Sequence, residues 1–358
     1  MPKDFTIVVG TIGDGLWRST DAGASFGRPQ NQLGGPYNTV DTLVKGLAVD
    51  PHDPAHVVAG MGFNATPYSA VVGSVHGIIE SFDGGATWTP LVGFPHQVEV
   101  WRFAFDPHVP GRYFVGTRPA GLFRTEDGGV TFEKLPLETD VFCRGIGLTR
   151  VTSISFHPDD TRTMFTTVEI GGVHRSLDGG DTWERVMTNL AGPIPNGNVF
   201  GEDGRNDCHF ARILGGDPTI VLVSTPDGLY VSEDVGTTWS DYLVNQTFPA
   251  QYHRDIAVKL DDPDTIFVGT GDGVAGQEGA IQITRDRGRT WETAALPDEC
   301  NSPVWCFAQH PSDPETILGC THLGMLFGST DGGHTWTKYR REFTEVRVIC
   351  WLPNVASS

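Results

Sequence analysis

The chain has 358 residues and a formal net charge of −19, with 25 Lys and Arg residues against 44 Asp and Glu residues. This acidic balance, together with the lack of any Lys/Arg run, argues against nucleic acid as a partner. No stretch approaches the ~20 apolar residues that a membrane-spanning helix needs. The length fits one large all-β domain.

The N-terminus, Met1-Pro2-Lys3-Asp4, leads into a strand-like run without the apolar segment of a secretion signal, so we expect a cytoplasmic protein. The cysteines have neither metal-type nor disulfide-scaffold spacing, and we expect those in strands to be small core residues. The six positions are Cys143, Cys208, Cys300, Cys306, Cys320 and Cys350.

The first predicted elements are a β-rich run at residues 7–11, a short apolar run at residues 15–18 and a signature at residues 19–26. The signature has the form Ser/Thr-x-Asp-x-Gly-x-Ser/Thr-aromatic and predicts a tight turn, because the carboxylate accepts backbone N–H groups and the glycine permits positive φ. It recurs with aspartates at Asp21, Asp83, Asp127, Asp178, Asp234, Asp286 and Asp331 and closing aromatics at Phe26, Trp88, Phe132, Trp183, Trp239, Trp291 and Trp336.

A further strand is predicted ahead of the two strands that precede each later signature. Its clearest copies end in a turn with proline, at residues 46–51, 102–107, 153–158 and 306–311, and looser copies lie at residues 209–213 and 255–259. With a short strand after each signature, every repeat has the four strands of a propeller blade.

The two ends of the chain complete the count of repeats. The N-terminus begins with the second strand of a blade, and residues 346–351 form an inner-type strand with no blade after it. Pairing these ends closes the ring and removes its open edges. We therefore predict a single domain over residues 1–358, an all-β, seven-bladed propeller with four antiparallel strands per blade.

The signature resembles the Asp-box, or BNR, repeat, and the whole chain resembles the Asp-box propeller superfamily. That superfamily contains sialidases, xyloglucan-active glycosidases, sortilin-type receptors and a photosystem assembly factor. The resemblance implies that the box lies on the turn between the outer two strands, away from the substrate face. The seven box aspartates are therefore expected to be structural.

Two members of the superfamily can be compared with the chain in more detail. Sialidases use an arginine triad on a six-bladed propeller, whereas the count here is seven and no Arg-Ile-Pro motif stands near the start. Xyloglucan-active enzymes pair two seven-bladed propellers and place one carboxylate from each across a cleft. This sequence contains only one propeller, so half of such a site would be missing. The resemblance predicts the fold strongly and the activity weakly.

The starts of the inner strands should line the mouth of the central channel, and they carry many charged and aromatic residues. Charged groups that converge on a narrow channel must be paired, hydrated or used. Long loops on the same face, at residues 64–76 with Tyr68, 184–206, and 271–279 with Asp272 and Glu278, add to this region, as does Glu169. The inner-strand candidates are Lys45, Trp101, Arg102, Thr152, Ser153, Asp207, His209, His253, Arg254, Asp255, Trp305, Glu345 and Arg347.

Three hypotheses about this site remain open. In the first, two carboxylates among Asp207, Asp255, Glu169, Glu278 and Asp272 act as acid and base on a glycosidic bond. Arg102, Arg254 and Arg347 then hold the substrate with Lys45, and Trp101 and Trp305 stack on sugar rings or plug the channel. In the second, His209 and His253 bind a divalent metal with Asp207 for a lyase or hydrolase reaction. In the third, the charges satisfy one another and the face binds a protein partner.

The leading prediction is a carbohydrate-active, glycoside-hydrolase-like enzyme with a small-molecule or oligosaccharide ligand. Its catalytic candidates are Asp207, Asp255, His209 and His253. The alternatives are a metal-assisted lyase or hydrolase and a non-enzymatic, protein-binding propeller. An enzyme should lose its function when His253 or Arg254 is replaced, whereas a scaffold should tolerate the change.

Overall fold

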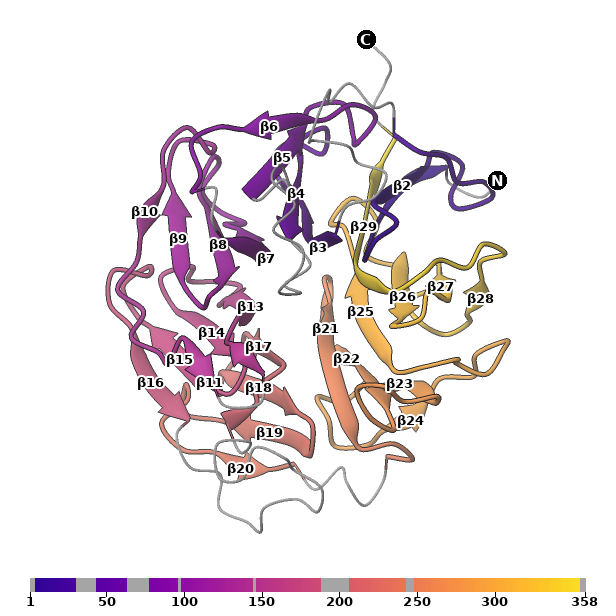
Figure 1. The fold of residues 1–358 in the computed structure, drawn as a ribbon. Helices are drawn as coiled ribbons and strands as arrows, with labels where there is room; N and C mark the ends of the chain where they lie inside the picture. The colour runs from indigo at the N-terminus through magenta and orange to yellow at the C-terminus, as the bar shows by residue number, and fades with distance from the viewer. Residues whose placement is uncertain are drawn as a thin grey trace.

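The computed structural model describes residues 4–29, 43–62, 77–95, 98–143, 146–187, 206–242 and 248–354. These residues form antiparallel sheets arranged in a ring (Figure 1), and they contain no α-helix. The all-β, seven-bladed propeller is confirmed. None of the described residues belongs to a helix that is long and apolar enough to cross a membrane.

The first three complete blades each contain four strands in the order of the chain. Blade 2 has β3 (Leu43–Val49), β4 (Val57–Gly62), β5 (Gly77–Ser81) and β6 (Thr89–Leu91). Blade 3 has β7 (Glu99–Phe105), β8 (Tyr113–Arg118), β9 (Leu122–Thr125) and β10 (Glu133–Lys134). Blade 4 has β13 (Val151–Phe156), β14 (Met164–Val168), β15 (Gly172–Ser176) and β16 (Glu184–Met187).

The next three blades follow the same order from the channel outwards. Blade 5 has β17 (Phe210–Leu214), β18 (Ile220–Thr225), β19 (Gly228–Ser232) and β20 (Ser240–Asp241). Blade 6 has β21 (Tyr252–Lys259), β22 (Asp262–Gly271), β23 (Gly279–Thr284) and β24 (Glu292–Thr293). Blade 7 has β25 (Val304–Ala308), β26 (Ile317–Thr321), β27 (Leu326–Ser329) and β28 (Thr337–Lys338).

Blade 1 closes the ring with strands from both ends of the chain, as the sequence predicts. The N-terminal strands β1 (Phe5–Thr11) and β2 (Leu16–Ser19) pair with the C-terminal β29 (Val346–Pro353), which occupies the inner position. The β1–β29 register runs from Phe5 opposite Pro353 to Thr11 opposite Val346. In the described residues a single bridge, Arg18 to Gly27, stands where the other blades have their outer strand.

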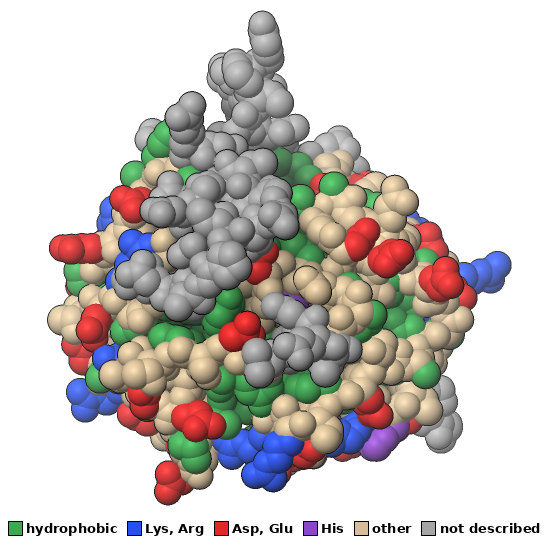
Figure 2. All heavy atoms as spheres, turned by 90° about the horizontal axis from the view of Figure 1, so that it is seen from below, with side chains coloured by type: hydrophobic (Ala, Val, Ile, Leu, Met, Phe, Trp, Pro, Cys, Tyr) green, Lys and Arg blue, Asp and Glu red, His purple; other side chains and the backbone are tan. Residues whose placement is uncertain are grey.

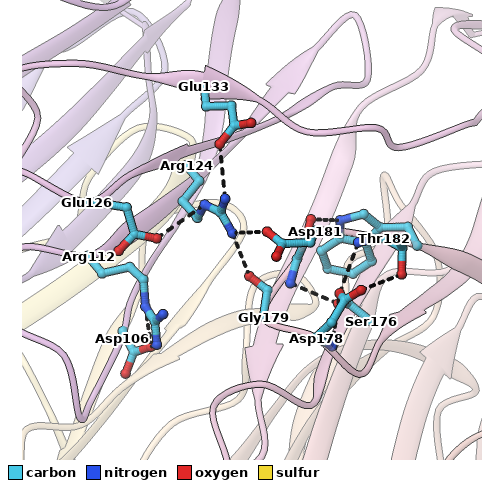
Figure 3. Close-up of polar contacts among 12 residues, drawn as sticks. Asp106, Arg112, Arg124, Glu126, Glu133, Ser176, Asp178, Gly179, Asp181 and Thr182 are labelled. Atoms are coloured by element: carbon cyan, nitrogen blue, oxygen red, sulfur yellow. Dashed lines mark hydrogen bonds and ion pairs between the residues drawn. The ribbon is translucent and has the colours of Figure 1, made fainter.

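Each Asp-box is a hydrogen-bonded turn between the third and fourth strands of its blade. In blade 4, Asp178 Oδ1 accepts the hydroxyl of Ser176 at 2.8 Å and the backbone N–H of Thr182 at 2.9 Å, and Oδ2 accepts the Thr182 hydroxyl at 2.6 Å (Figure 3). These bonds lower the pKa of Asp178 to about 2. Since they satisfy the carboxylate within its own turn, the structural role expected for the box fits the geometry.

The aromatic residue that closes each box packs between neighbouring blades. Trp88 of blade 2 is 1% exposed and lies in a cluster with Val8 and Leu16 of blade 1. Trp336 of blade 7 packs in the same way against Phe267 and Ile281 of blade 6. The core is therefore divided into one apolar layer for each junction, which leaves the centre of the ring as a channel.

Arginines on the third strands tie neighbouring blades together. Arg124 on β9 reaches the box of blade 4, where it donates to the Gly179 carbonyl at 3.1 Å and to Asp181 at 2.7 Å (Figure 3). Arg18 donates in the same way to the Gly84 carbonyl of blade 2, and Arg175 to the Val235 carbonyl of blade 5. Among the described residues on the face shown in Figure 2, acidic side chains are scattered between apolar ones.

Candidate active site at the channel mouth

The candidate residues at the starts of the inner strands are positioned by β-bulges. In six of the seven inner strands the register with the second strand shifts at this level, so that an extra residue has no direct partner. A bulge re-aims a side chain that the regular pleat would place elsewhere. The residues that the register skips are Lys45, Trp101, Thr152, the Arg254–Asp255 pair, Trp305 and Arg347.

One side of the mouth is organised around Trp101 and the buried carboxylate of Glu99. Glu99 Oε2 accepts the Trp101 indole N–H at 2.8 Å and the Lys45 ammonium at 2.9 Å. The Arg150 guanidinium lies 4.1 Å from the centre of the Trp101 ring, and Lys45 Nζ lies 4.6 Å from it. Arg118 Nη1 is 3.7 Å from the same Glu99 oxygen. The Trp101 ring is therefore in cation–π contact with Lys45 and Arg150.

The opposite side has a similar arrangement around Trp305, which is 3% exposed. The guanidinium carbons of Arg254 and Arg347 lie 3.6 Å and 4.7 Å from its ring centre. His322 stacks on the ring at 4.3 Å, and its Nε2 lies 3.3 Å from Glu345, which also pairs with Arg347. Burial acts to raise the pKa of Glu345, but His322 and Arg347 outweigh it and lower the value to about 2.

Asp207 and Glu169 supply carboxylates from adjacent blades between these two aromatic groups. Glu169 directly follows β14 and forms an ion pair with Arg150. Asp207 precedes β17, and its Oδ1 is buried without a hydrogen-bond partner among the described residues. Burial, with the nearby charge of Glu169, raises the pKa of Asp207 to about 7, against the opposing effects of Arg254 and Arg150. Asp207 is thus poised to carry a proton near neutral pH.

The two histidine rings do not converge on one point. His209 Nδ1 lies 2.5 Å from the backbone carbonyl of His253, so this nitrogen carries the hydrogen, and burial holds the pKa of His209 well below its usual value. The neutral ring presents Nε2 at 3.8 Å from Asp207 Oδ1, which is therefore not an ion pair. The His253 ring is fully buried, with its centre 5.5 Å from that of Phe248, and burial lowers its pKa to about 4.

A divalent metal gains no further support from this geometry. Across the described ranges, no group of three or more His, Cys, Asp or Glu side chains is arranged to hold a metal ion. His209 faces Asp207 across the mouth, whereas His253 contributes its backbone carbonyl rather than its ring.

Asp255 and Arg102 lie deeper in the channel than the mouth. Asp255 Oδ2 accepts the backbone N–H of Phe307 at 2.8 Å, and burial raises its pKa. Arg102 donates to the Thr152 carbonyl at 2.5 Å and to the Trp101 carbonyl at 3.3 Å. Both residues line the lower chamber of the channel, so Asp255 does not share a site with Asp207.

The long loops named as candidates contribute little to what can be described. Residues 64–76, with Tyr68, and residues 188–205 lie outside the described part of the chain. In the loop at residues 271–279, Asp272 accepts the backbone N–H groups of Gln277 and Glu278 at 3.2 Å and 3.0 Å. Asp272 therefore closes its own loop, and Glu278 is exposed beside it.

Several residues of the mouth were missed by the sequence analysis: Glu99, Arg118, Arg150 and His322. Arg118 ends a second strand and Arg150 lies in the link that leads to β13, positions at which polar residues are ordinary. Only the ring arrangement shows that these side chains meet. Glu99 carried the strongest available signal, since an acidic residue stands two positions before Trp101, just ahead of the strand predicted at residues 102–107.

The seven blades, the box at each outer turn and the closure by β29 define a seven-bladed propeller of BNR type, and the chain belongs to this superfamily of propellers. Two family models match parts of it: that described as sortilin, neurotensin receptor 3, over residues 227–354, and that of the photosynthesis system II assembly factor YCF48 over residues 51–206.

Two curated relatives illustrate the range of similarity. A probable oligoxyloglucan-reducing end-specific xyloglucanase of Neosartorya fischeri is 26% identical over 324 residues, which cover 77% of this chain and 38% of that protein. The photosystem II assembly lipoprotein Ycf48 of a Synechococcus species is 23% identical over 296 residues, which cover 74% of this chain and 80% of that protein. The chain thus spans little more than a third of the xyloglucanase's length.

Solved structures show the same fold. A GH74 xyloglucanase from Xanthomonas campestris superposes with a TM-score of 0.65 at 18% identity, covering 98% of this chain and 53% of that one. YCF48 from Cyanidioschyzon merolae gives a TM-score of 0.55 at 14% identity, covering 85% of this chain and 87% of that one. The xyloglucanase relatives support a glycoside-hydrolase-like propeller, while the Ycf48 relatives keep a non-enzymatic role open.

Proposed function

We propose that the channel mouth is the oligosaccharide-binding active site of a glycoside-hydrolase-like enzyme, with Asp207 as the proton donor. The observation that carries the proposal is the carboxyl of Asp207, whose burial beside Glu169 raises its pKa to about 7. A general acid works best when its pKa lies close to the working pH. Glycoside hydrolysis needs such an acid and a second carboxylate that stays ionised.

Glu169 fits the role of the second carboxylate. It comes from blade 4, adjacent to Asp207 at the start of blade 5, and it forms an ion pair with Arg150. Its charge is one cause of the raised pKa of Asp207, so the two groups are electrostatically coupled. In the proposed reaction Asp207 protonates the glycosidic oxygen and Glu169 assists the attacking group.

The cations of the mouth would hold the sugar through hydrogen bonds rather than ring stacking. The rings of Trp101 and Trp305 are buried beneath guanidinium groups, so their faces are not free platforms. Arg254 forms no ion pair within the described part of the chain, and the one hydrogen bond of its guanidinium there is to the hydroxyl of Tyr252 at 3.2 Å. Its remaining N–H groups suit sugar hydroxyls or carboxylates.

The test is hydrolysis of a panel of neutral β-linked oligosaccharides, including xyloglucan fragments, with products separated by chromatography. We expect cleavage by the unmodified protein and a loss of about 100-fold or more in Asp207→Asn and in Glu169→Gln. Asp272→Asn is the matched control, because Asp272 bonds only within its own exposed loop. Equal rates in Asp207→Asn and the unmodified protein would refute the assignment, and so would a panel that is neither cleaved nor bound.

A second candidate is a protein-binding propeller. An additional hairpin, β11 (Phe142–Cys143) with β12 (Gly147–Leu148), lies in the link before β13 and exposes 66% of Phe142, 50% of Val141 and 38% of Leu148. Arg118 connects it to the mouth by donating to the Leu148 carbonyl at 3.1 Å. If a protein partner binds this hairpin, the Phe142→Asp variant should lose that binding and the Asp207→Asn variant should keep it. Equal binding by both variants would exclude the hairpin as the binding surface.

A further inference from the structure

The lower half of the channel forms a chamber separate from the mouth. Its volume is about 610 Å³, and it is lined by the lower parts of the inner strands and by the turns that contain Pro51, Pro107 and Pro158. The mouth residues Asp207, Arg254 and Trp305 are not part of its lining. Pockets of this volume accommodate small organic molecules.

The walls of this chamber are largely aromatic. Five phenylalanines line it: Phe103, Phe105, Phe156, Phe210 and Phe307. Each is partly buried, with one side packed in an apolar cluster between blades. The uncovered parts of the rings therefore face the chamber, where an apolar ligand body would remove them from water.

The chamber also has polar and charged residues in its lining: Arg102, Arg212, Asp255, Ser155, Lys259, Gln309 and His310. Asp255 is 8% exposed, and its Oδ1 is buried without a hydrogen-bond partner among the residues that the structure describes. The chamber lining thus brings one carboxylate near two guanidiniums, and no N–O distance within 4 Å links Asp255 to Arg102 or Arg212 in the described residues. The charge of Asp255 nevertheless acts to raise the pKa of both arginines, so the three groups lie close enough to interact.

The guanidinium of Arg212 retains donors for a ligand. Its hydrogen bond among the described residues is made by Nε, which donates to the Ile256 carbonyl at 3.0 Å, and its guanidinium carbon lies 4.9 Å from the centre of the Phe210 ring. The two terminal amino groups of Arg212 therefore remain as donors for a ligand. The Lys259 ammonium is paired with Asp261 and Glu315, so Arg102 and Arg212 set against Asp255 leave one positive charge in excess. A positive charge in excess inside an apolar chamber favours a ligand with a negative charge.

We propose that the lower chamber is a second ligand site, which binds a small monocarboxylate with an aromatic or branched apolar body. The carboxylate accepts hydrogen bonds from Arg212 and Arg102, and the body contacts the phenylalanine walls. This site is independent of sugar cleavage at the mouth, so either assignment can fail without the other.

The test uses calorimetric titration of the full chain with 3-phenylpropionate and with its uncharged analogue 3-phenylpropionamide. We expect the carboxylate to bind about tenfold or more tightly than the amide, which cannot form charge-assisted bonds with the arginines. Acetate, which lacks the apolar body, should also bind more weakly. Equal binding of acid and amide, or no binding of the acid at millimolar concentration, would overturn the proposal without any variant.

Variants locate the site. Arg212→Gln should remove the preference for the acid, and Phe210→Ala should weaken acid and amide alike. Arg254→Gln, at the mouth, should leave both affinities unchanged. Binding that is lost in Arg254→Gln and kept in Arg212→Gln would place the ligand at the mouth and contradict the assignment. Thermal melting of each variant confirms that it is folded.

Discussion

Asp207 is distinguished from the other aspartates of the chain by its surroundings rather than by its sequence context. The box aspartates accept several hydrogen bonds each, which lower the pKa values of Asp178 and Asp234 to about 2. Asp207 is largely buried and lies near Glu169, so its pKa is raised. The surroundings thus shift the pKa of the same residue type downwards in the turns and upwards at the mouth.

This difference predicts how the stability of Asp207→Asn depends on pH. The folded pKa of Asp207 is about 7, above the ordinary value of ~3.9, so the folded state is weakened as pH rises from about 4 through 7. Asparagine removes this penalty. The melting temperature of Asp207→Asn should exceed that of the unmodified protein at pH 8 by on the order of 1–4 °C and equal it near pH 4. A variant that melts lower at pH 8 would contradict the raised pKa.

The box aspartates should show the opposite dependence. Asp234 accepts bonds from Ser232 and Thr238, and its lowered pKa means that its contribution is present above the ordinary value of ~3.9 and lost as pH falls towards 2. Asp234→Ala should lower the melting temperature near pH 7 by on the order of 2–4 °C, with a smaller difference at pH 2. The control is Glu233→Ala, at an exposed position in the same box, which should melt like the unmodified protein.

At the scale of the strand, the sequence predicted which residues reach the mouth but not how they do so. Lys45, Trp101, Arg254, Trp305 and Arg347 stood out because charged or indole side chains begin strands that otherwise look like core. The bulges that aim them could not be predicted, since a bulge changes the register with a partner strand and leaves the composition of its own strand unchanged.

The candidate site was only partly predictable for a related reason. Asp207, Arg254 and Glu169 were named from the sequence and lie in the mouth, whereas Arg150 and Glu99 were not named because their role depends on neighbours from other blades. Asp255 was grouped with Asp207 because both lie near inner strands. The bulge in β21 separates Asp255 from the mouth and directs it to the lower chamber.

The arginine links between blades make a prediction at the same scale. Arg124 bonds to the Gly179 carbonyl and lies within ion-pair distance of Asp181, Glu126 and Glu133. Arg124→Gln should therefore increase hydrogen exchange of the backbone in the blade 4 box, residues 176–183, while the distant blades keep their protection. Arg289→Gln, at an exposed position in blade 6, is the control, and an equal effect of both changes would show that the link is unimportant.

At the scale of the whole molecule, the ring depends on the pairing of the two ends of the chain. β29 supplies the inner strand of blade 1, and its Ile349 is 4% exposed in a cluster with Ile7 and Trp351. Ile349→Asp places an unpaired charge in this junction and should lower the free energy of unfolding by about 3 kcal/mol or more. Arg347→Gln, two residues earlier and directed to the mouth, should cost much less. If chemical denaturation shows that both variants lose a similar free energy of unfolding, this would argue against closure of the ring by β29.

The closed ring also explains why one channel holds two different environments. The bulges direct Lys45, Arg254 and Arg347 to one end, whereas the regular pleat below them presents phenylalanines. A charged mouth and an apolar chamber therefore follow each other along one axis. The repeats determine the ring, and the departures from the repeat determine what the ring can bind.

The most direct test of the active-site assignment is the pH profile of kcat/KM for one cleaved oligosaccharide, measured from pH 5 to 9 with the unmodified protein and with Asp207→Asn. We predict that kcat/KM of the unmodified protein falls as pH rises through about 7, because Asp207 loses its proton there. The variant should be about 100-fold or more slower and lack this limb. A variant that retains the rate and the same alkaline limb would show that Asp207 is not the proton donor.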